Sequence, residues 1–462
     1  MDTNPYFARG FEPLRIEYDR ADLAIEGHIP DELDGTFYRI GPSPQFPPRA
    51  VYNPLNGDGM VHAFELHRGR VSYRNRWVRT QQWNIDRAAG RAMFGTSGNP
   101  ADSDPSVAAM RTDGVANTNL VWHGGKLLAL EEGHGPIEID PATLETLGSW
   151  SFAGKLSRNM TAHPKIDPAT GEMIFFANFP SGRLNGDVEI YFATAAGELT
   201  RSQMIHGPYA ALIHDFAITR DFVVVFFCPV TVSIKRAMNG RPPIAWEPAH
   251  GIHVAIVPRN GSDAPRWFNG PAAMAWHSMN AFNDGVRILV DVCAQENAVF
   301  PHADGSPTNP RRAAQFLTRW EFDWRAPGAF HSARLSDLIC EYPRIDERRL
   351  GARYRYGYLA CIGGPGTDDI FHRGLVRFDH ENGEMKVYRA GAQFAVAEPV
   401  FIPKSSDSRE GEGFVITNIY DERRDASHLG IFDACAIERG PIARARLDHR
   451  VPVGFHALWK PR

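Results

Sequence analysis

The stretch ALIHDFAITRDFVVVFF, residues 211–227, shows the pattern that decides the fold. It ends in the run FVVVFF, and the strongly apolar region from Phe222 to Val232 is the longest of its kind in the chain. That region is far shorter than the ~20 apolar residues that span a bilayer. The stretch therefore predicts a buried β-strand, with His214 at the edge of the apolar sequence.

Similar short runs recur along the whole chain, and almost all are four to eight residues long. They include TFYRI, AFELH, KLLAL, MIFFANF, VEIYFAT, GIHVAIV, RILVDV, TRWEF and FVITNIY. Turn signals such as NGDG at 56–59, NG at 239–240 and NDG at 283–285 separate them. Helical periodicity is scarce, and residues 311–317 are the best helical candidate. The sequence predicts an all-β protein.

The number of hairpins favours a closed or radially repeated architecture, because an open sheet of so many strands would leave unpaired edges. The histidines at 163, 214, 277 and 456 are separated by 51, 63 and 179 residues, and the last value is close to three times sixty. If each histidine came from the inner strand of a different propeller blade, all four would meet on the propeller axis. We therefore expect residues 1–462 to form a single propeller domain of about seven blades, although no clean internal repeat supports it.

The composition is that of an ordinary globular protein with a large core. Of 462 residues, 43% are hydrophobic and 23% charged. The formal net charge is −4, with basic residues scattered among acidic ones, so no basic face is available to neutralise phosphates. These features argue against a nucleic-acid partner.

Cysteine usage and the N-terminal sequence point to a reducing compartment. The five cysteines are widely spaced and form no C-x-x-C pair. The N-terminal sequence MDTNPYFARGFEPLRIEYD has acids and prolines where a signal peptide would need a basic and then an apolar segment. We expect a cytoplasmic protein. Peripheral membrane contact stays an open alternative, and the oligomeric state is not predicted.

Four histidines stand out among the eighteen because each lies at the edge of a strand-like apolar run. Their local strings are MTAHPKID, ALIHDFAI, AWHSMNAF and VGFHALW, around His163, His214, His277 and His456. Neutral imidazoles on stiff strands can hold a non-haem metal by nitrogen alone and leave positions open for dioxygen or substrate. A single histidine is more often structural, so the joint context carries this hypothesis.

The chain resembles the carotenoid cleavage oxygenases, within them the bacterial branch that includes the lignostilbene dioxygenases. The resemblance runs nearly end to end. Its motifs are DGTFYRIGPSPQ (34–45), NGDGMVHAFEL (56–66), GVANTNLVWHGGKLLALEE (114–132), TAHPKIDPATGEM (161–173), IHDFAITRDF (213–222), WHSMNAF (276–282), EYPRID (341–346), AEPVFIP (397–403) and FHALW (455–459).

The resemblance implies a seven-bladed β-propeller with capping loops over an axial Fe(II), and cleavage of a conjugated C=C bond by dioxygen to two carbonyl products. It assigns the four histidines as iron ligands. It also implies that three glutamates orient ligand rings: Glu132 for His214, Glu341 for His277 and Glu398 for His456. Thr118 matches a threonine whose methyl group crowds one iron position, and an ordinary strand threonine is the alternative.

The sequence departs from the lignostilbene pattern at two positions. Members of that branch grip the substrate's 4-hydroxyl with a tyrosine and a lysine, and here Ser97 and Glu131 stand in their places. A carboxylate at 131 would repel a phenolate, and once buried it needs a partner or a raised pKa. We therefore predict an apocarotenoid or carotenoid substrate, with stilbenes and phenylpropenoids as the alternative.

Two functions of other classes are alternatives. A propeller that only binds ligands would use the histidines for a structural ion, and a calcium-dependent propeller hydrolase would need oxygen ligands. The set of glutamates and Thr118 argue against the first, and four imidazoles argue against the second. Metal analysis discriminates them, since iron supports the oxygenase and calcium supports the hydrolase.

Overall fold

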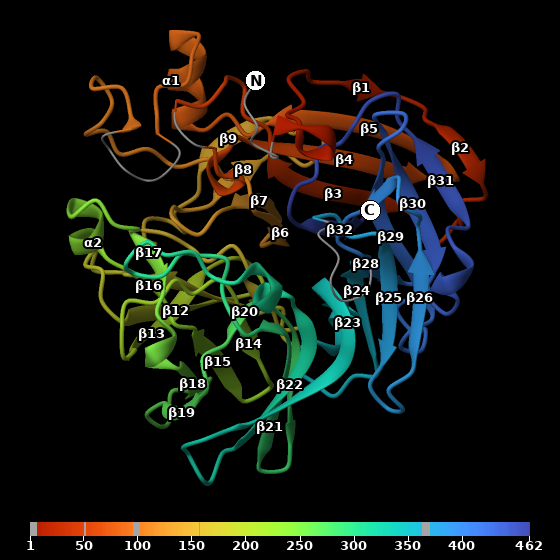
Figure 1. The fold of residues 1–462 in the computed structure, drawn as a ribbon. Helices are drawn as coiled ribbons and strands as arrows, with labels where there is room; N and C mark the ends of the chain where they lie inside the picture. Colours follow the sequence, from red (N-terminus) through yellow and green to blue (C-terminus); the bar gives the residue numbers. More distant parts are fainter. Residues whose placement is uncertain (1–6, 50–51, 96–101, 157, 363–369) are drawn as a thin grey trace. The chain divides into compact units, whose positions relative to one another are not determined.

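The regular secondary structure of the protein is mostly β-strand, as the sequence predicts (Figure 1). The structure is a computed structural model, and it describes residues 7–49, 52–95, 102–156, 158–362 and 370–462. The chain divides into two compact units. The first unit comprises Met1–Ala162, Arg373–Leu375 and Lys386–Arg462, and the second comprises His163–His372 and Val376–Met385.

The first unit contains three sheets. Their strand orders are β1-β5-β4-β3-β32, β6-β7-β8-β9 and β2-β31-β30-β29-β27, with β28 also paired to β29. The strands are β1 (Asp19–Arg20), β2 (Ala24–Gly27), β3 (Gly35–Pro42), β4 (Gly59–His67), β5 (Arg70–Trp77), β6 (Asn119–His123), β7 (Lys126–Leu130), β8 (Ile137–Ile139), β9 (Thr146–Ser149), β27 (Phe394–Val396), β28 (Val400–Pro403), β29 (Gly413–Asp421), β30 (Ala426–Asp433), β31 (Ala443–Arg446) and β32 (Ala457–Pro461). In Figure 1, β32 lies beside β3, which joins the beginning and the end of the sequence in one sheet.

The second unit contains the sheets β10-β11-β12-β13, β14-β15-β18-β19 and β16-β17, and most of a seven-stranded sheet that runs in order from β20 to β26. The strands are β10 (Lys165–Ile166), β11 (Met173–Asn178), β12 (Asp187–Ala193), β13 (Leu199–His206), β14 (Phe216–Ile218), β15 (Phe222–Phe227), β16 (Val230–Val232), β17 (Ile244–Trp246), β18 (Ile252–Pro258), β19 (Arg266–Gly270), β20 (Met274–Asp284), β21 (Arg287–Gln295), β22 (Phe316–Asp323), β23 (His331–Ile345), β24 (Tyr356–Cys361), β25 (Gly374–Asp379) and β26 (Met385–Arg389). The chain passes between the units within β25 and β26.

Strand β15 shows why its sequence is apolar at every position. Val223, Val225 and Phe227 pack into one hydrophobic cluster of the second unit. Val224 and Phe226 pack into another. Because side chains alternate along a strand, a strand with a core on both faces needs an unbroken apolar run.

The α-helices are short, and they lie where the sequence did not indicate them. Helix α1 (Gln81–Ala89) begins at Thr80, whose side chain accepts a hydrogen bond from the Trp83 amide, and ends at Gly90, which has φ of 66°. The second is α2 (Ile234–Met238). None of the helices among the described residues is long and apolar enough to cross a membrane.

The helix predicted at residues 311–317 is wrong. Residues Pro310–Ala313 form only a 3-10 turn, and β22 begins at Phe316. From there the side chains of Thr318, Trp320 and Phe322 are buried at every second position. This period of two, with β-branched and aromatic residues, outweighs the local helical signal.

Candidate metal centre

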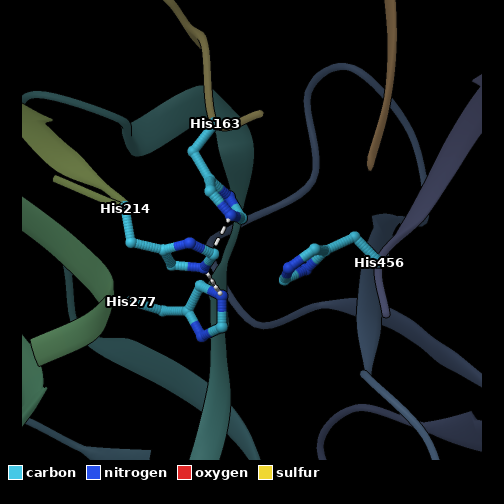
Figure 2. Close-up of side chains that lie close together, drawn as sticks. All are labelled: His163, His214, His277 and His456. Atoms are coloured by element: carbon cyan, nitrogen blue, oxygen red, sulfur yellow. Dashed lines mark hydrogen bonds between the residues drawn. The ribbon is translucent and has the colours of Figure 1, made fainter. Parts of the chain in front are cut away.

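Three of the four predicted ligands come from the second unit, where each lies just before a strand or inside one. His163 precedes β10 by two residues, His214 precedes β14 by two residues, and His277 lies within β20. His163 and His214 are each 6% exposed. Figure 2 shows the three rings turned toward one another.

The spacing of the three rings fits a common metal ion. Nε2 of His214 lies 3.1 Å from Nε2 of His163 and 3.1 Å from Nε2 of His277. Two nitrogens bound at about 2.1 Å to one metal, at right angles, would be about 3.0 Å apart. A hydrogen-bond chain explains the contacts less well, because one ring nitrogen of a neutral histidine cannot both donate and accept. The geometry therefore favours metal coordination.

The tautomer of His277 is set by Glu341. Nδ1 of His277 donates to Oε2 of Glu341 at 2.6 Å, which leaves the lone pair on Nε2. The backbone amide of Tyr342 donates to the same oxygen. Tyr342 has φ of 55° and stacks on the His277 ring with centroids 5.7 Å apart. Thus the ring is held at its edge by the carboxylate and at its face by the tyrosine.

His456 has a matching partner within the first unit. Its Nδ1 donates to Oε1 of Glu398 at 3.1 Å, and the Ala457 amide donates to Oε2 of the same carboxylate at 2.6 Å. The His456 amide donates to the backbone oxygen of Thr118 at 3.3 Å. Both His456 and Glu398 are buried. Each unit therefore presents buried imidazole that could bind a metal, from His163 and His214 in the second unit and from His456 in the first.

Thr118 and Glu132 also belong to the first unit. Thr118 is 5% exposed, and its hydroxyl donates to the side-chain oxygen of Asn117 at 2.9 Å. Glu132 is half-buried, and its backbone oxygen accepts a hydrogen bond from the Asn159 side chain at 2.9 Å. The pairing of Glu132 with His214 stays a prediction.

Glu131 has acquired the partner that a buried carboxylate needs. Its Oε1 contacts Nδ1 of His134, and its Oε2 accepts from the amides of Val115 at 2.9 Å and Ala116 at 3.2 Å. Burial alone would lower the pKa of His134, but the hydrogen bond and charge of Glu131 raise that pKa above its usual value. Ser97, the other departure from the lignostilbene pattern, lies outside the described residues.

Sequence reasoning missed a buried polar network beside the three histidines. Asp215, next to His214, forms an ion pair with Lys165, with Nζ and Oδ1 2.7 Å apart. Burial would raise the pKa of the Asp215 carboxyl, but the charge of Lys165 holds that pKa below its usual value. The available signal was an acidic residue inside the apolar string LIHDFAI.

Comparisons with known proteins show the family of the chain. Residues 11–461 match the family described as retinal pigment epithelial membrane protein. The chain is 35% identical to isoeugenol monooxygenase of Pseudomonas nitroreducens, over 100% of this chain and 98% of that protein. It is 36% identical to lignostilbene-alpha,beta-dioxygenase isozyme III of Sphingomonas paucimobilis, over 97% and 95% of the two chains.

A solved structure agrees over the same length. The crystal structure of lignostilbene dioxygenase from Pseudomonas brassicacearum matches with a TM-score of 0.95 and 35% identity, over 100% of this chain and 99% of that one. The resemblance found in the sequence motifs is thereby confirmed. The chain belongs to the carotenoid cleavage oxygenase family of enzymes.

Proposed function

We propose that His163, His214, His277 and His456 together hold one Fe(II), and that the protein uses dioxygen to cleave a conjugated C=C bond. The observation that carries this proposal is the set of three imidazole nitrogens at 3.1 Å spacing in the second unit. The two atoms of dioxygen end in the two products, so that one alkene and one O2 give two carbonyl compounds. Iron, when bound, would supply the place where dioxygen is activated beside the alkene.

The residues around the ligands have separate tasks in this proposal. Glu341 and Glu398 accept the Nδ1 hydrogens of His277 and His456, so each ring presents Nε2 to the metal. The hydroxyl of Thr118 is occupied by Asn117, and its methyl group would crowd one metal position, as the family resemblance implies. No carboxylate is among the ligands, so the proposal requires no organic cosubstrate.

The proposal includes the seven-bladed propeller expected from the family. Strand β23 supports this count, because its first part pairs with β22 and its second part, from Cys340, pairs with β24. The seven-stranded sheet can thus be read as two four-stranded blades that share one long strand. With the five other sheets of four or more strands, this makes seven blades.

The substrate class that we propose is an aryl alkene, a stilbene or a phenylpropenoid. The support is that isoeugenol monooxygenase and lignostilbene dioxygenase are similar to this chain over almost its full length. These relatives favour stilbenes and phenylpropenoids, which were the alternative from the sequence, over the apocarotenoid substrate that the sequence analysis expects first.

An apocarotenoid is the second candidate, and one observation favours it. The carboxylate of Glu131 stands where a lysine would grip a phenol, and it is already bound to His134 and two backbone amides. A free phenol should therefore gain nothing at this position. An alkene without a 4-hydroxyl would be accepted equally well.

The test is a substrate panel with the purified, iron-loaded protein. The panel contains a 4-hydroxystilbene, its 4-methoxy analogue, an isoeugenol-type phenylpropenoid and an apocarotenal, and the aldehydes are identified by mass. We expect aldehydes from an aryl alkene, at similar rates for the hydroxy and methoxy forms, and none from His277→Ala protein. Iron occupancy near one per chain with no alkene cleaved would refute the proposed reaction. A preference of about tenfold for the 4-hydroxyl form would show that another residue grips the phenol.

A further inference from the structure

Asp215 is linked to the chain segments that bear His163, His214 and His277, the three clustered histidines of the second unit. It directly follows His214 in the chain, Lys165 lies two residues after His163, and Ser278 directly follows His277. Oδ1 of Asp215 accepts from the Lys165 ammonium at 2.7 Å, and Oδ2 accepts from the Ser278 backbone amide at 2.7 Å. The three segments that bear histidines therefore share one carboxylate.

The Ser278 amide is available to Asp215 because β20 is irregular at this point. Its pairing with β21 shifts between Ala275 and Ser278, and again between Ser278 and Asn280. A bulge removes residues from the ladder of backbone hydrogen bonds, and a buried amide left in this way needs another acceptor. Oδ2 of Asp215 provides it, and the Ser278 hydroxyl lies 2.8 Å from the same oxygen.

The remaining contacts fix the carboxylate itself. The Phe216 amide donates to Oδ1 at 2.8 Å. Asp215 as a whole residue is 3% exposed. A buried carboxylate with one cation and two backbone amides has its charge compensated and little freedom to rotate.

The three rings need such support from outside. In the tautomers that bind a metal through Nε2, three lone pairs face one another across contacts of 3.1 Å, and before metal binds they repel each other electrostatically. A metal site binds tightly only when its ligands are held close to the coordinating geometry.

We propose that Lys165, Asp215 and Ser278 form a positioning network that sets the spacing of His163, His214 and His277 for the metal. This proposal rests on the proposed function, since it assumes a metal at these histidines. In this proposal Asp215 does not contact the substrate. Replacing Asp215 changes metal binding only through the positions of the three histidines.

The experiment measures Co(II) binding to purified, metal-free protein, with the visible absorption of bound Co(II) as the report on coordination geometry. For Asp215→Asn, which keeps the shape and removes the charge, we expect a 10–100-fold higher Kd and a changed Co(II) spectrum. Lys165→Met should have an effect in the same direction, and Lys165→Arg, which keeps a cation, should restore most of the affinity.

The matched control is Asp379→Asn. Asp379 is equally buried, and it pairs with Arg355 at 3.0 and 2.8 Å, away from any histidine ligand. This variant should lose thermal stability and keep the wild-type Kd and spectrum. Unchanged Co(II) binding in Asp215→Asn would overturn the network, and so would an equal loss in Asp379→Asn. Failure of the wild-type protein to bind Co(II) would instead refute the metal site and the proposed function with it.

Discussion

The two units of the protein hold their histidines in different ways, and the two glutamate pairs show the difference. In the first unit, Glu398 divides its oxygens between the His456 ring and the Ala457 amide. In the second unit, one oxygen of Glu341 accepts both the His277 ring and the Tyr342 amide. The other oxygen of Glu341 is buried and has no hydrogen-bond partner among the described residues.

The two glutamates therefore hold different parts of the segments that bear the histidines. Glu398 fixes the ring of His456 and the backbone directly after it. Glu341 fixes the ring of His277, while the backbone after that ring is held by Asp215 through Ser278. One carboxylate does both tasks in one unit, and two carboxylates share them in the other.

The largest effect is expected from removing a ligand itself, whichever unit supplies it. His277→Ala and His456→Ala should each abolish turnover and lower the iron content, because the proposed site would lose a quarter of its nitrogens. Iron per chain and aldehyde formation are the measurements. His428→Ala is the control, since His428 is similarly buried in the first unit, and it should retain iron. A His456→Ala protein with full iron and activity would remove His456 from the proposed ligand set.

A smaller and unequal effect should follow when each glutamate is replaced by glutamine. In Glu398→Gln an NH2 group must face either the His456 ring hydrogen or the Ala457 amide, so we expect a 10–100-fold loss in metal affinity. In Glu341→Gln the amide oxygen can take the place of Oε2 and keep both donors, so we expect a loss below about tenfold.

The measurement is the Kd for Co(II), with Glu198→Gln at an exposed position as the control. Equal losses in the two variants would mean that the charge, and not the division of acceptors, is what supports the ring.

Glu131 repeats the arrangement of Glu398, with one oxygen at a ring nitrogen and the other at backbone amides. Glu131→Lys leaves the Val115 and Ala116 amides without their acceptor, so the free energy of unfolding should fall by about 1–3 kcal/mol. Glu131→Gln keeps an acceptor and should lose less. Urea denaturation of metal-free protein measures both. A lysine variant as stable as the wild type would show that these amides find another partner.

The smallest effect concerns pH. The pKa of His134 is raised above 6.5 in the folded protein by Glu131, so its stabilising contribution is present below pH 6.5 and is lost as pH rises through the raised value. Because 40% of the side chain is exposed, the contribution should be below about 1 kcal/mol. Unfolding free energies of wild type and His134→Gln should differ more at pH 5.5 than at pH 8.5. A larger difference at pH 8.5 would contradict the assignment.

The sequence indicates the four proposed ligands because each histidine lies at the edge of an apolar run and in a motif of its family. Glu341 and Glu398 were found through those motifs, and the structure puts each carboxylate on the ring expected for it. The need of Glu131 for a partner followed from the cost of burying charge, but its partner His134 was not foreseen.

The Asp215 network could not be predicted from local sequence. Ser278 lies 63 residues from Asp215, and its amide is freed only by a change in strand register. Register depends on tertiary pairing, which periodicity does not encode. Helix α1 was missed for a related reason, since it depends on its Thr80 cap and on Gly90 more than on an apolar stripe.

The two irregularities of β20 have a consequence for protein design. At the first irregularity, β20 advances three residues, from Ala275 to Ser278, while β21 advances two. At the second, β20 advances two residues, from Ser278 to Asn280, while β21 advances one. Each adds one residue, so the first reverses the alternation of side chains and the second restores it. The short segment between the two irregularities can thus turn its side chains to the opposite face of the sheet. The residues of β20 before and after it keep the alternation of a regular strand. Paired insertions of this kind offer a route for placing a coordinating histidine in a regular sheet without redesigning the core on either side.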